Sequence, residues 1–124
     1  IRKLQDRKID LGKVREATWQ GRPTWVVGAA EDDTTSAQFW VDRERLLFVR
    51  LIETGDGPSG PAREETQFNK YRPLGGGWIA PECVFYINGK LFLTETYEDV
   101  RADPQLAPST FAVDSFRTPP WIPR

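Results

Sequence analysis

The chain has 124 residues, of which 39% are hydrophobic and 28% charged, and its 17 basic and 18 acidic residues leave a net charge of −1. This length suits one domain that buries roughly two-thirds of its unfolded surface. The balanced charge gives no electrostatic case for a nucleic-acid partner or an anionic membrane surface. The apolar runs are also far shorter than the roughly 20 residues of a membrane-spanning helix.

Two residue types are absent and one is nearly so. The sequence contains no histidine and no methionine, and Cys83 is its only cysteine. Without histidine the chain lacks the usual general base near neutral pH and the commonest metal ligand. A lone cysteine forms no internal disulfide and says nothing firm about the redox compartment. Because no initiator methionine is present, we expect a processed form or a part of a longer protein, with any signal peptide outside this sequence.

In chain order, the sequence predicts a succession of strands. Segment 1–13 has sparse apolar residues, and we interpret it as a short helical or irregular lead-in. About eight runs typical of antiparallel strands follow, at 14–19, 24–29, 38–42, 46–53, 66–72, 78–87, 90–101 and 110–113. The Gly- and Pro-rich stretch 54–62 is predicted to be a surface loop, and 118–124 a Pro-rich tail. We therefore predict a single antiparallel β domain over 14–117.

The clearest predicted element is a hairpin at 83–94, because Asn88-Gly89 suits a type I′ turn with positive φ at both central residues. Pairing outward from this turn gives the opposing pairs Phe85–Phe92, Cys83–Thr94, Val84–Leu93 and Tyr86–Leu91. Both faces are then apolar, so each needs a second layer or one lines a cavity for an apolar ligand. The same register sets Glu82 opposite Glu95, and like charges repel. We therefore expect the pairing to bulge or break near Pro81, which cannot donate a ladder hydrogen bond.

Structural roles explain the candidate catalytic groups best. Cys83 has no histidine to deprotonate it, and a strand position is typical of an inert buried thiol. Solvated faces and turns explain the carboxylate clusters (31–33, 64–65, and 95 with 98–99) more simply than a glycosidase pair does. The cluster 31–33 lacks the alternating spacing of a calcium loop, and the three glycines at 75–77 open no helix and are no phosphate cradle. We predict no enzyme, no metal site and no cofactor.

Aromatic residues make up 12% of the chain and include five tryptophans. Such side chains either fill the core of a β domain or line an apolar ligand site, because they bury large areas. The alternation in the central strands leaves neither side cleanly polar. Both interpretations therefore stay open on these residues alone.

Two stretches resemble parts of the LolA-like family of outer-membrane lipoprotein-sorting proteins. Residues 38–53, QFWVDRERLLFVRLIE, resemble its Trp-hydrophobic-Asp hairpin. Residues 71–113 resemble the end of the domain, where a Gly-Gly-Trp-hydrophobic-x-Pro entry precedes a hairpin, a final strand and a closing Phe. The matching positions are Gly76, Gly77, Trp78, Pro81, Asp103, Leu106 and Phe111. The resemblance covers most of 12–113 and corresponds to the C-terminal part of such a domain, without its early strands and lid helices.

The resemblance implies a curved antiparallel sheet, an incomplete, half-open β-barrel with a hydrophobic concave side. It also implies a non-catalytic protein of the periplasm or cell envelope that binds a lipid or a lipoprotein acyl chain. By alternation and hairpin pairing we predict that the concavity is lined by Phe39, Val41, Val49, Leu51, Phe68, Phe85 and Phe92. Apolar surface left without a lid favours a homodimer or contact with another envelope protein. The alternative function is a protein-interaction or sensor module on the same scaffold, with no lipid ligand.

Overall fold

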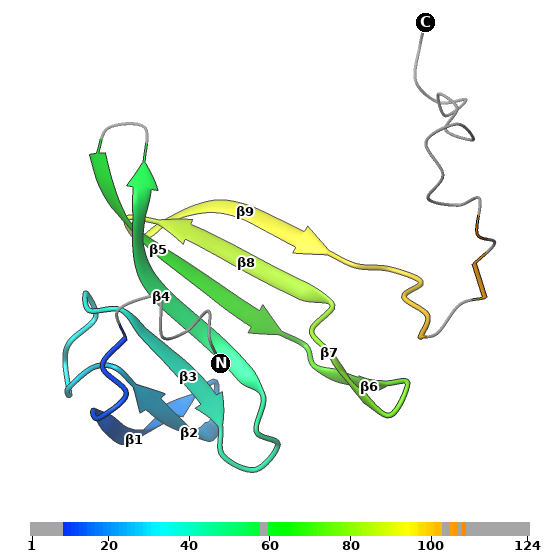
Figure 1. Ribbon diagram of the computed structural model, residues 1–124, viewed down its shortest axis with the longest axis horizontal. Helices are drawn as coiled ribbons and strands as arrows, with labels where there is room; N and C mark the ends of the chain where they lie inside the picture. The colour runs from blue at the N-terminus through cyan, green and yellow to red at the C-terminus, as the bar shows by residue number, and fades with distance from the viewer. Residues whose placement is uncertain (1–8, 58–59, 103–104, 107, 109–124) are drawn as a thin grey trace, which may run out of the picture.

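The computed structural model describes residues 9–57, 60–102, 105–106 and 108. Seven strands form one antiparallel sheet in the order β1-β2-β3-β4-β5-β8-β9, and β6 and β7 form a separate hairpin (Figure 1). The strand bounds are β1 (Val14–Trp19), β2 (Arg22–Val27), β3 (Gln38–Asp42), β4 (Phe48–Gly57), β5 (Gly60–Asn69), β6 (Arg72–Leu74), β7 (Gly77–Ile79), β8 (Glu82–Ile87) and β9 (Lys90–Thr96). The outer strands β1 and β9 do not pair, so the sheet is not closed. The predicted antiparallel β fold with little helix is confirmed for the described residues.

Two tight turns follow directly from the sequence. Gln20-Gly21 connects β1 to β2 and Asn88-Gly89 connects β8 to β9, and each pair has φ values of 50° and 77°. Positive φ at both central residues is the requirement of a type I′ turn, which matches the right-handed twist of the strands. The predicted Asn88-Gly89 turn is therefore confirmed.

The predicted register of the β8–β9 hairpin is wrong beyond its first pair. Tyr86 faces Leu91 as predicted, but the register shifts there, and Phe85 then faces Leu93 instead of Phe92. The bulge lies beside the turn and not near Pro81. Because of the bulge, Glu82 faces Thr96. The carboxylates of Glu82 and Glu95 are therefore not opposite each other, which avoids the repulsion expected in the predicted register.

Two other predicted segments need correction, and two more lie outside the described residues. Stretch 54–62 belongs to β4 and β5, whose pairing continues from Thr54–Arg63 to Gly57–Gly60. Tertiary pairing overrides the weak strand preference of glycine and proline here. The predicted run 78–87 is divided into β7 and β8 at Pro81. The predicted strand 110–113 and the tail 118–124 lie outside the described residues.

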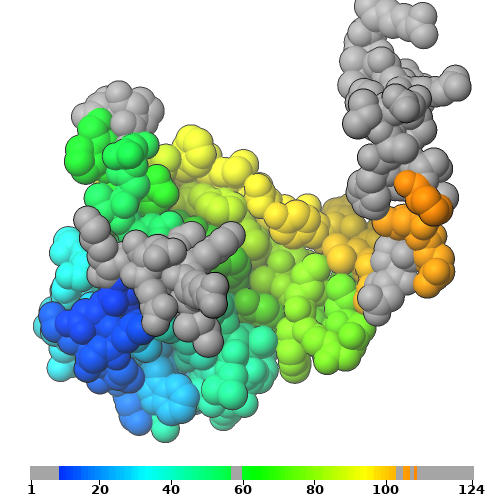
Figure 2. Space-filling view, in the orientation of Figure 1, coloured from blue at the N-terminus to red at the C-terminus, as the bar shows by residue number. Residues whose placement is uncertain are grey.

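The first five strands curl around one face of the sheet. Trp19 of β1 lies 4.7 Å from the Arg50 guanidinium of β4, although β2 and β3 separate these strands. Gln20 of the first turn donates to Asn69 Oδ1 at the end of β5, at 3.0 Å. A flat sheet would place β1 and β4 about three spacings of 4.8 Å apart, so these contacts require strong curvature. In Figure 2, β1–β3 (blue to cyan) form a rounded body from which β6–β9 (green to yellow) extend.

The hydrophobic core lies on this concave face. Val26, Trp40 and Val49 are buried there with Ala29, and Ala17, Trp19 and Tyr71 pack against them. The strand registers place Val26, Trp40 and Arg50 in one row across β2, β3 and β4. We call the face of the sheet that carries this row the concave face, and the opposite face the convex face.

A substitution at Gly28 tests the packing at the end of β2. Gly28 has φ +109°, and a Cβ there would press on the Ala37 carbonyl oxygen and lie 2.8 Å from Ile9 Cγ2. We expect Gly28→Ala to lower the free energy of unfolding by about 2 kcal/mol, through backbone strain and overpacking together. The measurement is urea-induced unfolding.

Gly21 provides a matched control, because it has φ +77° and a Cβ added there would have no atom within 4 Å. Gly21→Ala therefore carries only the backbone strain, at about 1 kcal/mol. Equal losses of unfolding free energy in the two variants would show that the close approach to Ala37 does not contribute to the loss.

Candidate functional site

The seven residues predicted to line the concavity fall into three groups. The first group, Phe39, Val41 and Leu51, lies on the convex face, opposite the row of the core. There Phe39 stacks on Phe48, with ring centroids 4.9 Å apart. The predicted side of the sheet is therefore corrected for these three residues, which are half-buried on the outside of the curl.

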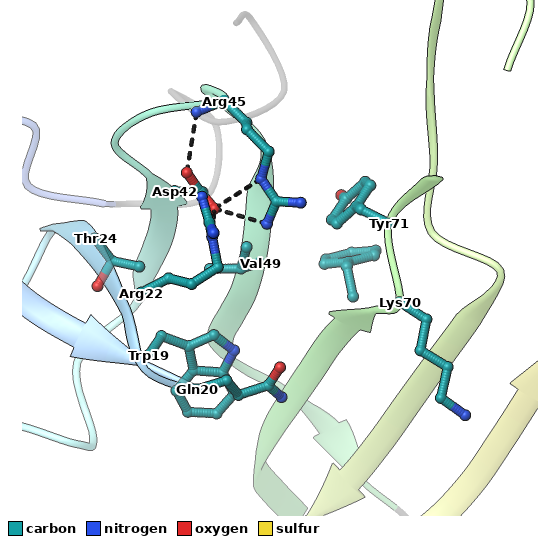
Figure 3. Close-up of a pocket in the computed structure, with 10 residues that line it drawn as sticks. Trp19, Gln20, Arg22, Thr24, Asp42, Arg45, Val49, Lys70 and Tyr71 are labelled. Carbon is teal, nitrogen blue, oxygen red and sulfur yellow. Dashed lines mark hydrogen bonds and ion pairs between the residues drawn. The ribbon is translucent and has the colours of Figure 1, made fainter. Parts of the chain in front are cut away.

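The second group, Val49 and Phe68, lines a cavity of about 70 Å³ on the concave side (Figure 3). Val49 reaches this face because the β3–β4 register shifts between Trp40 and Val41, and a one-residue shift turns a side chain to the other face. Val49 is only 6% exposed. The cavity lies where the β1–β2 turn, the β3–β4 turn and the end of β5 meet, and its other lining residues are Trp19, Gln20, Arg22, Thr24, Asp42, Arg45, Lys70 and Tyr71.

The third group, Phe85 and Phe92, meets in a cavity of about 230 Å³ over β5, β8 and β9. Thr66, Phe85 and Leu93 form one row across these three strands, on the convex face. We call this cavity the β8–β9 groove, lined by Glu64, Glu65, Thr66, Phe85, Tyr86, Ile87, Phe92, Leu93 and Glu95. Its walls are mainly apolar, and Phe92 is 68% exposed at its border.

Asp42 is a fully buried carboxylate at the polar end of the smaller cavity. Arg22 Nε donates to its Oδ2 at 2.6 Å, and Arg45 donates to the same oxygen from Nε and Nη2 at 3.0 and 2.8 Å. The backbone N–H groups of Glu44 and Arg45 donate to Oδ1, each at 3.0 Å. Burial alone would raise the pKa of Asp42, but these hydrogen bonds hold it well below its usual range. The carboxylate therefore fixes the β3–β4 turn as a permanent anion.

Arg50 forms a second buried polar centre in the middle of the concave face. Its guanidinium lies 4.7 Å from the Trp19 ring and 5.0 Å from the Trp40 ring, and Nε donates to Glu65 Oε1 at 2.8 Å. Glu65 also accepts from Arg63 and Gln67. Burial would raise the pKa of Glu65, but the hydrogen bonds from Arg50 and Gln67 lower it.

The expectation that the cluster 64–65 is solvated is therefore wrong for Glu65, which is only 7% exposed. A signal is present in the sequence, because Arg63, Glu65 and Gln67 alternate on one side of a strand. Oppositely charged side chains in one row of a strand can pair with each other in the interior, as well as lie in solvent.

Two further groups that the structure describes, Cys83 and Asp33, have structural surroundings. Burial raises the pKa of the Cys83 thiol, and the nearby Glu95 and Glu82 carboxylates raise it further, which disfavours the nucleophilic thiolate. Asp33 accepts from the backbone N–H groups of Thr35 and Ser36 and so organises the acidic loop. Among the described residues, no cluster of His, Cys, Asp and Glu suits a metal ion. In the same part of the chain no helix is long and apolar enough to cross a membrane.

Comparison with known proteins gives no relative for this chain. No family model matches it, and no curated protein or solved structure matches it significantly. The class of protein is therefore defined by the fold and the sites alone. It is an open, curled antiparallel β domain with two buried ion-pair centres on its concave face and an apolar groove on its convex face.

Proposed function

We propose that this domain is a non-catalytic binding protein of the periplasm or cell envelope that holds the acyl chain of a lipid or lipoprotein in the β8–β9 groove. The observation that carries the proposal is the meeting of Phe85, Ile87, Phe92 and Leu93 in one cavity of about 230 Å³. Each methylene moved from water into such surroundings contributes about 0.8 kcal/mol. The resemblance of residues 38–53 and 71–113 to lipoprotein-sorting proteins implies the same ligand class and location, but it implies binding on the concave side, whereas this groove lies on the convex face.

The carboxylates of the groove refine the ligand class. Glu64 and Glu95 lie on the same face as Phe85 and contribute to the lining. A free fatty acid would bring its own carboxylate toward them, and like charges repel at close range. The groove therefore favours an uncharged, esterified chain, such as those of an acylglycerol or a lipoprotein.

Substitution of Phe92 by Gln tests the groove. We expect a fluorescent neutral monoacylglycerol to bind the purified protein, and Phe92→Gln to weaken this binding about tenfold, because an aromatic wall is replaced by a polar group. The measurement is a fluorescence titration, accompanied by mass spectrometry of lipid extracted from the purified protein.

Leu46→Gln is the matched control, because Leu46 is 69% exposed and lies in the β3–β4 turn, away from the groove. This variant should bind the probe like the wild-type protein. Absence of both extracted lipid and probe binding would refute the carrier function. Equal affinities of the two variants would refute the assignment of the groove.

One observation favours a second function, a protein-interaction module with no lipid ligand. β9 is the outermost strand of the described sheet, and its Leu91 and Phe92 are 63% and 68% exposed. A free strand edge with apolar side chains can pair with a strand of another envelope protein or of a second copy. A lipid-free protein that dimerises with concentration, and whose dimer Phe92→Gln disrupts, would favour this alternative.

A further inference from the structure

The outer edge of β9 presents apolar side chains that no described residue covers. β9 is the last strand of the described sheet and pairs with β8 on one side only (Figure 1). Three consecutive side chains of this strand, Leu91, Phe92 and Leu93, are 63%, 68% and 43% exposed. An apolar strand edge of this kind is a template for pairing with a further strand.

The geometry of the hairpin shows which backbone groups of β9 can pair outward. Lys90 closes the type I′ turn and pairs with β8, so the backbone N–H and C=O groups of Leu91 point away from β8. At the other end of the strand, the Tyr97 N–H donates to the Pro81 carbonyl oxygen at 2.8 Å. Hydrogen-bonded residues alternate along an antiparallel strand, so the backbone of Thr94 also points away from β8.

The bulge in β9 brings two opposite charges to the same face of the sheet. Lys90 and Glu95 face Ile87 and Cys83, which lie with Phe85 on the convex side of β8. In a regular strand, two residues five positions apart lie on opposite faces, but the extra residue of the bulge removes this difference. Within the described residues neither Lys90 nor Glu95 forms an ion pair.

These charges make the edge complementary to itself. Two β9 strands related by a two-fold axis run antiparallel, and one register sets Lys90 of each copy opposite Glu95 of the other. The same register sets Leu91 opposite Thr94, and these are residues whose backbone groups point outward. A strand from a different protein would need an acidic and a basic residue at the matching positions, whereas a second copy supplies both.

We propose that two copies of this chain pair through β9 in this register and form one continuous sheet across the two-fold axis. Phe92 of each copy then faces Leu93 of the other, which covers the most exposed apolar side chains of the strand. Opposite charges directly across an antiparallel ladder stabilise the pairing and fix its register. The two β8–β9 grooves meet at the axis, and the pairing does not depend on whether they contain an acyl chain.

Reversal of one charge tests the interface, with analytical ultracentrifugation of the delipidated protein over a series of concentrations as the measurement. Lys90→Glu sets two glutamates opposite each other at both ends of the pair, and we expect the dimer dissociation constant to rise at least about tenfold. Lys13→Glu is the matched control, because Lys13 is 58% exposed on its side chain and precedes β1, the other outer strand. This variant should dimerise like the wild-type protein.

A mixture of two variants tests the register itself. Glu95→Lys should also weaken its own dimer, because each lysine then faces Lys90. In an equimolar mixture of Lys90→Glu and Glu95→Lys, the heterodimer regains two attractive pairs, so we expect an affinity within about threefold of that of the wild-type protein. If circular dichroism shows that Glu95→Lys does not fold, Glu95→Gln takes its place in the mixture, where one attractive pair and no repulsive pair remain.

Three results would overturn the proposal. The first is a wild-type protein that stays monomeric at millimolar concentration. The second is a dimer that Lys90→Glu leaves unchanged, which would place the contact on another surface. The third is a mixture no more dimeric than its two components, which would exclude the pairing of Lys90 with Glu95.

Discussion

Replacing Asp42 by Asn is expected to lower the free energy of unfolding by about 3 kcal/mol, because it removes the anion that two arginines enclose. The Asp42 side chain is 1% exposed, and its carboxylate connects Arg22 of β2 to Arg45 of the β3–β4 turn. An amide at this position keeps the shape but offers a neutral oxygen to two cations and a donor that has no acceptor. Chemical denaturation monitored by tryptophan fluorescence measures the loss.

Glu44 supplies the control for this experiment, because it also pairs with Arg22, at 2.6 Å, but is 64% exposed on its side chain. Glu44→Gln should cost well under about 1 kcal/mol, as is usual for a surface ion pair. A similar loss in both variants would mean that the burial of Asp42 adds nothing to its contribution.

The contribution of Asp42 to the free energy of unfolding depends on pH. The pKa of Asp42 is lowered in the folded protein, so its contribution to stability is fully present above the unfolded value and is lost as the pH falls. The loss should begin below about pH 4, where the carboxyl group of the unfolded chain takes up its proton first. Asp42→Asn lacks this group, so its stability should fall less steeply in acid than that of the wild-type protein.

Local sequence features predict many of the strands and turns of the sheet. Irregular strand pairing determines the other features, and local patterns do not predict it. The strands at 14–19 and 38–42 have the predicted bounds, and the Asn88-Gly89 turn has the predicted backbone. These features depend on alternation and on the φ requirements of a turn, which are local properties. The register shifts at Trp40/Val41 and Phe85/Tyr86 are not local, and each of them displaces side chains relative to the predicted faces.

These two shifts explain why the predicted lining residues do not form one surface. Simple alternation assigns Phe39 and Val49 to one face, but the first shift places them on opposite faces. The second shift separates Phe85 from Phe92 in the ladder while leaving both in the β8–β9 groove. The direction of the curl is equally absent from local patterns, because it follows from contacts such as Trp19 with Arg50 between strands far apart in the sheet.

Arg50 gives the second large expected effect. The protein combines Arg, Glu and Trp once in the interior, where Arg50 contacts two tryptophan rings, and once at the surface, where Arg43 contacts one. Arg50→Met should lower the free energy of unfolding by about 3 kcal/mol, since it removes a partner of the buried Glu65 and two cation–π contacts. The Arg50 and Glu65 side chains are only 15% and 8% exposed. Methionine retains most of the apolar stem between the two tryptophan rings, so the loss reports mainly on the charge.

Arg43 is the matched surface position, because its guanidinium lies 5.4 Å from the Trp25 ring and pairs with Glu16 at 2.8 Å. Glu16 is 70% exposed on its side chain, so solvent screens the pair, and Arg43→Met should cost less than about 1 kcal/mol. Urea unfolding of both variants measures the two losses in the free energy of unfolding. Their difference shows how much burial adds to the contribution of an arginine that pairs with Glu and contacts Trp. A loss for Arg50→Met as small as that for Arg43→Met would show that the Arg50–Glu65 pair on the concave face contributes no more stability than a surface ion pair.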